Sequence, residues 1–220
     1  MVRLFSFWRS LATYRVRIAL NLKGLAPDEE VDVNLLKGAQ RESAYRAVNP
    51  MMALPALIDG EGPALFESLA IIEYLDETHP DPPLLPKDAR GRARVRGLAL
   101  IVACDAHPLI VPRIRNYLER EMHLDEPARN RWLQHWTLQA LETLEAHLAK
   151  EPETGRFCHG DAPTMADICL SGQVFAAGYF NVSTAGVPTV ERIFAECMKI
   201  DAFDRSQPLK QPEAPKKPAH

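Results

Sequence analysis

The stretch ALPALIDGEGPALFESL, residues 53–69, decides the fold class of its part of the chain. Two short apolar runs, Pro55–Ile58 and Ala64–Phe66, flank a segment that opens with Asp59-Gly60. An Asp-Gly pair between two such runs is typical of a β-hairpin. The stretch therefore predicts two adjacent antiparallel strands.

Pro55 stands at the head of the first run, and two readings of it are open. Proline cannot donate a ladder hydrogen bond, so an edge position or the first position of a strand accommodates it. A cis bond between Leu54 and Pro55 would instead turn the backbone N–H and C=O of Leu54 toward a peptide-like ligand. From this segment alone the edge-strand reading is favoured.

The hairpin leads into a helix that we predict over Ser68–His79. Ser68 is a typical N-cap residue, and Leu69, Ile72 and Leu75 share one apolar face. The unpaired N–H groups and the positive dipole end of a helix N-terminus bind anions, so a carboxylate ligand fits here. The alternative is that Ser68 only caps its own helix.

The residues before the hairpin alternate between strand and helix patterns. We predict a strand over Val2–Phe7, a helix over Tyr14–Lys23, a strand over Glu30–Leu35 and a helix over Arg41–Val48. With the hairpin and its helix, the order is β-α-β-α-β-β-α. Residues 1–80 are therefore expected to form one α/β domain.

Ser10 lies between the first predicted strand and the first predicted helix. A hydroxyl at a helix N-terminus can stabilise a ligand thiolate and lower its pKa below the free value of about 8.5. Taken singly, a lone serine in a loop is more often a helix cap than a catalytic residue.

A proline-rich segment, PDPPLLP at 80–86, separates this domain from a helical one. We assign 81–87 as a stiff linker, because this density of proline permits neither a helix nor a central strand. Helices are then predicted from Asp88 to about residue 118 with kinks near Pro108 and Pro112, over 126–148, from Thr164, and from Pro188 to about residue 200. Residues 88–206 are expected to form an all-helical domain, and 207–220 a mobile tail rich in proline and lysine.

Composition excludes several classes of partner. The net charge of −3 gives no strong field toward nucleic acid or anionic lipid, and the apolar stretches are too short for the roughly 20 residues of a membrane helix. No secretory signal is readable at the N-terminus. The four cysteines have no C-x-x-C spacing, which gives a metal site or disulfide framework little support and fits a reducing cytoplasm. Cys104 is expected to be a buried small apolar residue.

The ordered motifs of the chain resemble the zeta class of glutathione transferases, which includes the maleylacetoacetate and maleylpyruvate isomerases. They are Phe7-Trp8-Arg9-Ser10, residues 14–24, Asn49-Pro50-Met51, Leu54-Pro55-Ala56-Leu57, residues 67–75, residues 103–109, residues 160–167, Gln173-Val174-Phe175 and Asp201-Ala202-Phe203. The resemblance covers nearly the whole chain.

The resemblance implies a thioredoxin-like N-terminal domain, an all-α C-terminal domain, glutathione as cosubstrate, a small electrophilic substrate and a homodimer. It implies that Ser10 hydrogen-bonds the glutathione sulfur, and that Leu54 pairs with the cysteinyl backbone beside a cis Pro55. Glu67 and Ser68 would hold the γ-glutamyl end. Asp105 would reach the glutathione amine across a dimer interface. Thr164 and Asp167 match the family's structural capping box and are interpreted as folding residues.

Three departures from the family pattern concern the substrate side. Ser10 is followed by Leu11 and Ala12 instead of a Ser-Cys pair, Ile110-Val111 replace two asparagines, and Tyr179 replaces a basic residue. The candidate substrate-binding residues are Arg9, Leu11, Ala12, His107, Arg113 and Tyr179. Arg9 and Arg113 are candidate carboxylate anchors, because guanidinium groups pair with carboxylates in a bidentate manner. The alternative is that each arginine forms only a surface salt bridge.

Three functions follow as hypotheses. The first is glutathione-dependent cis–trans isomerisation of maleylacetoacetate or maleylpyruvate, a step of aromatic amino acid catabolism. The second is conjugation or dehalogenation of hydrophobic electrophiles, which the apolar departures favour. The third is a non-catalytic glutathione-binding or scaffold module, because a fold does not dictate a function.

Overall fold

The computed structural model describes residues 1–215 and divides into two compact units. The first unit comprises Met1–Leu84 and the described residues from Asp201 onward, and the second comprises Leu85–Ile200. Each unit is described by itself below.

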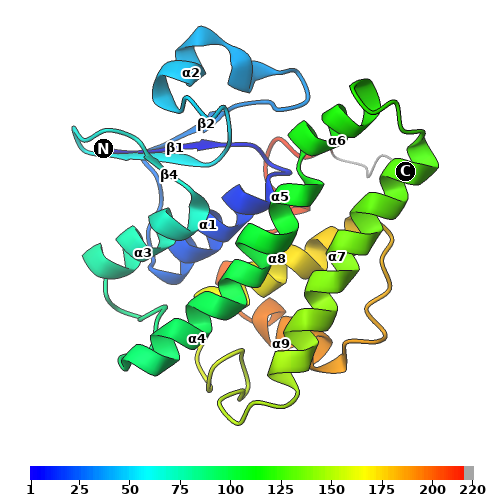
Figure 1. Ribbon diagram of the computed structural model, residues 1–220. Coiled ribbons are helices and arrows are strands. Elements are labelled where there is room, and N and C mark those ends of the chain that lie inside the picture. Colours follow the sequence, from blue (N-terminus) through cyan, green and yellow to red (C-terminus); the bar gives the residue numbers. More distant parts are fainter. Residues whose placement is uncertain (216–220) are drawn as a thin grey trace. The chain divides into compact units, whose positions relative to one another are not determined.

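A mixed four-stranded sheet forms the centre of the first unit (Figure 1). Its strands are β1 (Val2–Ser6), β2 (Glu29–Asp32), β3 (Ala56–Asp59) and β4 (Leu65–Phe66), in the order β2-β1-β3-β4. Strand β1 pairs in parallel with β2 and antiparallel with β3. Strands β3 and β4 are antiparallel, with Leu57 opposite Leu65, so the hairpin predicted at Asp59-Gly60 is confirmed.

The helices of the first unit cover both faces of this sheet. They are α1 (Leu11–Leu22), η1 (Ala39–Arg41), α2 (Ser43–Val48) and α3 (Ser68–Thr78), with α1 packed on α3. Helix α2 lies on the opposite side of the sheet from α1 and α3 (Figure 1). Successive side chains of β1 point to opposite faces of the sheet. Phe5 packs in the cluster that contains Tyr45 of α2, and the buried Leu4 points to the other face. The predicted β-α-β-α-β-β-α order and the thioredoxin-like fold are confirmed.

The proline-rich segment is held at the C-terminal end of α1 by a buried lysine. The ammonium of Lys23, whose side chain is fully buried, donates to the carboxylate of Asp76 at 2.7 Å and to the carbonyl of Pro82 at 2.6 Å. The same Asp76 oxygen accepts from the N–H of Leu84 at 2.7 Å. The Asp81–Pro82 bond is cis. Contacts across more than fifty residues therefore hold the segment, in addition to the stiffness expected of its prolines.

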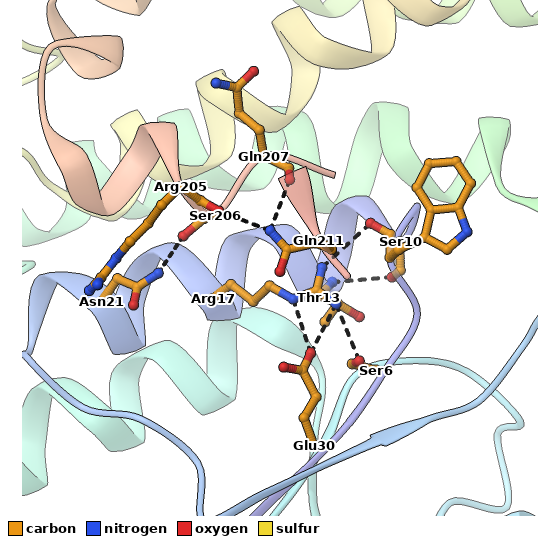
Figure 2. Close-up of polar contacts among 11 residues, drawn as sticks. Ser6, Ser10, Thr13, Arg17, Asn21, Glu30, Arg205, Ser206, Gln207 and Gln211 are labelled. Atoms are coloured by element: carbon orange, nitrogen blue, oxygen red, sulfur yellow. Dashed lines mark hydrogen bonds and ion pairs between the residues drawn. The ribbon is translucent and has the colours of Figure 1, made fainter. Parts of the chain in front are cut away.

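The chain returns to the first unit at its C-terminal end. Helix α10 (Asp201–Asp204) packs on α1, and the amide of Asn21 donates to the hydroxyl of Ser206 at 2.7 Å (Figure 2). This division differs from the boundary expected at residue 206. The tail expected to be mobile over 207–220 contains a 3-10 turn, η3 (Pro208–Lys210), within its described part, and residues 216–220 lie outside the described residues.

The second unit is helical within Leu85–Ile200, as predicted. Its elements are α4 (Ala89–Leu100), η2 (Ile101–Ala106), α5 (His107–Ile110), α6 (Pro112–Arg120), α7 (Glu126–Leu148), α8 (Met165–Tyr179) and α9 (Pro188–Met198). Helix α8 packs against α4, α7 and α9. Its first nine residues are all buried, which is typical of a helix enclosed by others.

The kink predicted near Pro112 corresponds to a break at Val111, whereas near Pro108 the helix continues through a π-helical turn. Pro108 has no N–H to donate to the carbonyl four residues earlier, and the preceding segment η2 is a π-helix in which His107 donates to the carbonyl of Val102. Val111 is extended, with φ −71° and ψ 159°, as expected for a residue before proline. The long predicted helix is therefore three helices and a π-helical turn.

The N-terminus of α8 carries the predicted capping box. The Asp167 carboxylate accepts from the N–H of Thr164 at 2.7 Å and from its hydroxyl at 2.7 Å, and its other oxygen accepts from the N–H of Cys158 at 2.8 Å. Asp167 is fully buried, and burial raises the pKa of its carboxyl group while these hydrogen bonds oppose the shift. Thr164 and Asp167 therefore hold both the helix start and the loop before it.

One helical stretch, Ala89–Arg120, is long and apolar enough by length and composition to cross a membrane. Core helices of water-soluble proteins pass the same test. This is weak evidence, and the expectation that the chain has no membrane span stays a prediction.

Candidate functional site

Ser10 is the N-cap of α1, at the end of a tight turn after β1. The N–H of Ser10 donates to the carbonyl of Phe7 at 2.9 Å, and the hydroxyl oxygen of Ser10 accepts from the N–H of Thr13 at 3.2 Å (Figure 2). A serine hydroxyl carries one donor as well as its acceptor positions. Capping thus uses the oxygen as an acceptor and leaves the O–H to donate, so the cap reading and the ligand reading of Ser10 are compatible.

A buried arginine lies beneath this turn (Figure 2). The guanidinium of Arg17 donates to Glu30 through Nε at 3.1 Å and Nη2 at 3.0 Å, to the Ser6 hydroxyl at 3.2 Å and to the Trp8 carbonyl at 3.4 Å. Burial lowers the pKa of Arg17, and the Glu30 carboxylate opposes this shift. Arg17 was not among the site residues predicted from the sequence. A sequence feature that could have indicated Arg17 is its position between Val16 and Ile18, in the buried centre of a helix.

The Leu54–Pro55 bond is cis, as the family resemblance implies. The favoured edge-strand reading is wrong, because Pro55 precedes β3, an inner strand paired with both β1 and β4. The backbone approaching it is fixed by two donors to one carbonyl. The Tyr45 hydroxyl donates to the Ala53 carbonyl at 2.6 Å, and the Asn49 amide donates to it at 2.9 Å. Burial raises the pKa of Tyr45 to about 12, so it stays a donor across the ordinary pH range. The roles of these two residues were not predicted.

The start of α3 differs from the prediction that Ser68 is its N-cap. Glu67 is the N-cap, with φ 64° and ψ 119°, and its side chain makes no capping hydrogen bond. Ser68 is the first helical residue and is buried. The N-cap therefore lies one residue before the predicted one, at a residue with a positive φ that residue-type preferences do not reveal. The first N–H groups of α3 thus receive no side-chain cap from Glu67, as an anion site requires.

Glu67→Gly is expected to raise the free energy of unfolding by about 1 kcal/mol, because glycine adopts a positive φ without the strain that glutamate bears there. Urea-induced unfolding measures the change. Glu67→Ala is the matched control, since alanine loses the same carboxylate and keeps the strain. An equal gain from both substitutions would show that the carboxylate, and not the backbone angle, is responsible.

The remaining predicted site residues occupy separate elements. In the first unit, Arg9 lies beside Trp8 with its guanidinium carbon 6.0 Å from the ring centre, Leu11 begins α1, and Ala12 is buried. In the second unit, Asp105 is exposed in η2, His107 begins α5, Arg113 is exposed on α6, and Tyr179 ends α8 edge-on to Phe180. Within the first unit, Ser10, Leu54, Pro55, Glu67 and Ser68 lie at the strand–helix junctions of one sheet.

The four cysteines are free thiols. Cys104 is exposed, so its expected burial is wrong, because it lies on an outward-facing part of η2. Cys158, Cys169 and Cys197 are buried free thiols. Across residues 1–215, the structure contains no group of three or more His, Cys, Asp or Glu placed to hold a metal ion.

Two family models match the chain. Residues 4–83 match the model described as "Glutathione S-transferase, N-terminal domain", and residues 126–194 match "Glutathione S-transferase, C-terminal domain". The first match spans the junctions that carry Ser10, Leu54 and Glu67.

Relatives are similar over nearly their full length. A maleylpyruvate isomerase from a Ralstonia species is 44% identical over 213 residues, which are 97% of this chain and 100% of that protein. A crystal structure of a maleylacetoacetate isomerase from Methylobacterium extorquens AM1, with bound malonate and glutathione, is 48% identical with a TM-score of 0.95 over 97% of this chain and 99% of that one. A second solved structure is the holo form of a maleylpyruvate isomerase, described as a bacterial glutathione S-transferase of the zeta class. It is 44% identical with a TM-score of 0.92, and the match covers 97% of this chain and 100% of that one.

Proposed function

Because this chain belongs to the zeta class of the glutathione S-transferase family, we propose that it is a glutathione-dependent cis–trans isomerase acting on maleylpyruvate or maleylacetoacetate. The observation that carries the proposal is the Ser10 hydroxyl, which caps α1 through its oxygen and keeps its O–H for a ligand sulfur. Relatives of nearly the same length carry these isomerase names.

The first unit offers groups suited to the γ-glutamyl and cysteinyl parts of glutathione. The first N–H groups of α3 and the Ser68 hydroxyl suit the γ-glutamyl carboxylate, and the Glu67 carboxylate suits its ammonium. The backbone of Leu54, at the cis bond to Pro55, suits the cysteinyl backbone. Asp105 is proposed to reach the glutathione amine from the partner of a homodimer.

Ser10 donates a hydrogen bond to the ligand sulfur and favours its thiolate form, because a donor stabilises the charged state more than the neutral one. Bound glutathione supplies the nucleophile, whose thiolate adds to the conjugated cis double bond, permits rotation about the resulting single bond, and departs to leave the trans product. Arg9 and Arg113 are the proposed anchors for the substrate carboxylates.

An assay of the purified protein with maleylpyruvate, maleylacetoacetate and a hydrophobic aromatic electrophile tests this assignment. The expected result is rapid, glutathione-dependent loss of one or both cis compounds. No loss above the rate with glutathione alone would contradict it.

The Tyr179 ring, 45% exposed where the resemblance implies a basic residue, favours the second function, conjugation or dehalogenation of hydrophobic electrophiles. Faster turnover of the aromatic electrophile, with weaker binding of dicarboxylates, would establish that function instead.

We further propose a homodimer in the cytoplasm. Support for the dimer comes from the family resemblance, and support for the reducing compartment comes from four free cysteines, one of them exposed. Light scattering on a size-exclusion column measures the mass of the assembly, and a mass of one chain would contradict the dimer.

A further inference from the structure

Arg17 links three segments of the first unit that meet beneath the Ser10 turn (Figure 2). Its guanidinium pairs with Glu30 of β2, donates to the hydroxyl of Ser6 at the end of β1, and donates to the carbonyl of Trp8 in the turn. Only 6% of the Arg17 side chain is exposed, against 35% for Glu30. A buried guanidinium shared among these acceptors holds the turn against the sheet.

The turn is fixed at both of its ends. On one side the N–H of Ser10 closes onto Phe7 at 2.9 Å, and on the other the Ser10 hydroxyl accepts from Thr13 at 3.2 Å. Between them the Trp8 carbonyl points to Arg17. The direction of the Ser10 hydroxyl therefore depends on the path of the turn, and the turn depends on Arg17.

We infer that Arg17, oriented by Glu30, is a positioning residue that aims the Ser10 hydroxyl at the glutathione sulfur. The inference rests on the proposed function of Ser10. It assigns to Arg17 no contact with glutathione or substrate. Its action passes through the Trp8 carbonyl and the Ser6 hydroxyl to the turn.

Arginine suits this role and lysine does not. The planar fork of a guanidinium donates in several directions at once, and here it reaches a carboxylate, a hydroxyl and a carbonyl. A lysine ammonium would keep the positive charge and the pairing with Glu30, but all of its donors converge on one nitrogen, whereas three separate nitrogens of Arg17 reach Glu30, Ser6 and Trp8. Arg17→Lys therefore separates positioning of the turn from a simple effect of charge on the thiolate.

Arg94 in the second unit provides a matched control. Its guanidinium donates to Glu151 at 2.6 Å, to the Cys158 carbonyl at 2.6 Å and to the Thr154 hydroxyl at 2.9 Å. The exposed fractions of this pair, 12% for Arg94 and 33% for Glu151, are close to those of Arg17 and Glu30. Arg94→Lys thus removes an equivalent set of contacts away from the first unit.

The experiment measures the pKa of the bound glutathione thiol from the ultraviolet absorbance of the thiolate across pH, together with kcat, KM and glutathione affinity. Arg17→Lys is expected to raise the bound-thiol pKa by about one unit and to lower kcat about tenfold at neutral pH. Glutathione affinity and KM for the cis substrate should change less than about twofold, since these contacts remain. Glu30→Gln, which keeps the shape of the side chain, is expected to shift the pKa in the same direction. Arg94→Lys should leave the pKa unchanged.

The outcomes separate this inference from the function on which it rests. A raised pKa in Ser10→Ala and in Arg17→Lys, without one in Arg94→Lys, supports both. A raised pKa in Ser10→Ala alone, with Arg17→Lys like the unsubstituted protein, overturns the positioning role and leaves the proposed function standing. An unchanged pKa in Ser10→Ala overturns the role of Ser10 and, with it, that of Arg17. If Arg17→Lys does not fold, the result for Glu30→Gln decides in the same way.

Discussion

Replacement of Ser10 by alanine is expected to lower kcat for the glutathione-dependent reaction by about 100-fold to 1,000-fold, the usual effect of losing one donor to a developing anion. The O–H that the helix cap leaves available would no longer stabilise the thiolate. The pKa of the bound thiol should then rise toward the free value of about 8.5. Steady-state kinetics and the absorbance of the bound thiolate measure the two effects.

Ser10→Asp separates catalysis from helix capping. Aspartate is a good N-cap, so the free energy of unfolding should stay near that of the unsubstituted protein, whereas Ser10→Ala should lose about 1 kcal/mol. The aspartate carboxylate offers no donor and repels a neighbouring thiolate, so its activity should be as low as that of Ser10→Ala. Nearly full activity in either variant would contradict the role of Ser10.

Replacement of Asp167 by alanine is expected to lower the free energy of unfolding by at least about 3 kcal/mol, since three buried donors lose their acceptor and each unsatisfied group costs about 1–3 kcal/mol. These donors are the N–H and hydroxyl of Thr164 and the N–H of Cys158. A loss of this size is a large fraction of the typical stability of a domain. Urea-induced unfolding of the second unit measures it.

Two further variants sharpen this prediction. Asp167→Asn keeps the shape of the side chain and one acceptor oxygen. Its free energy of unfolding should therefore lie between that of the unsubstituted protein and that of Asp167→Ala. Glu142→Ala, at an exposed position of α7, should change the free energy of unfolding by less than about 0.5 kcal/mol. If Asp167→Ala is as stable as Glu142→Ala, the capping box does not stabilise the fold.

Local patterns predicted those parts of the fold that neighbouring residues determine. Asp59-Gly60 predicted the hairpin, Thr164 with Asp167 predicted the start of α8, and Pro112 predicted the break at Val111 in the long helix. In each case the cause acts within about five residues, through a turn, a cap or a missing N–H. Strand and helix boundaries then agreed to within a few residues.

Contacts distant in sequence were not predictable in this way. Asn21 meets Ser206, Lys23 meets Pro82, and Arg17 meets Glu30, and no residue pattern marks these pairs. Each depends on how α1 packs in the folded unit, which single-residue preferences do not encode. The start of α3 was misplaced for a related reason, because Glu67 adopts a positive φ that its residue type disfavours.

In the candidate site, too, some residues were predicted from local sequence patterns and others were found only from the structure. Ser10, Leu54 and Ser68 were identified because a strand–helix junction or a proline marks each of them in the sequence. The backbone near these residues is held by hydrogen bonds from Tyr45, Asn49 and Arg17. These three residues were found only from those hydrogen bonds. Residues proposed to bind a ligand thus left a signal in the sequence, whereas the residues that hold them in place did not.

The most direct test of glutathione-dependent isomerisation is proton NMR of maleylpyruvate and maleylacetoacetate, each with the protein and an amount of glutathione far below that of the substrate. Isomerisation regenerates the thiol in every cycle, so at least one cis compound should convert completely to its trans isomer while the signals of free glutathione persist. Conversion that stops after one equivalent of glutathione, with the thiol consumed in a stable adduct, or no conversion of either compound, would contradict the account.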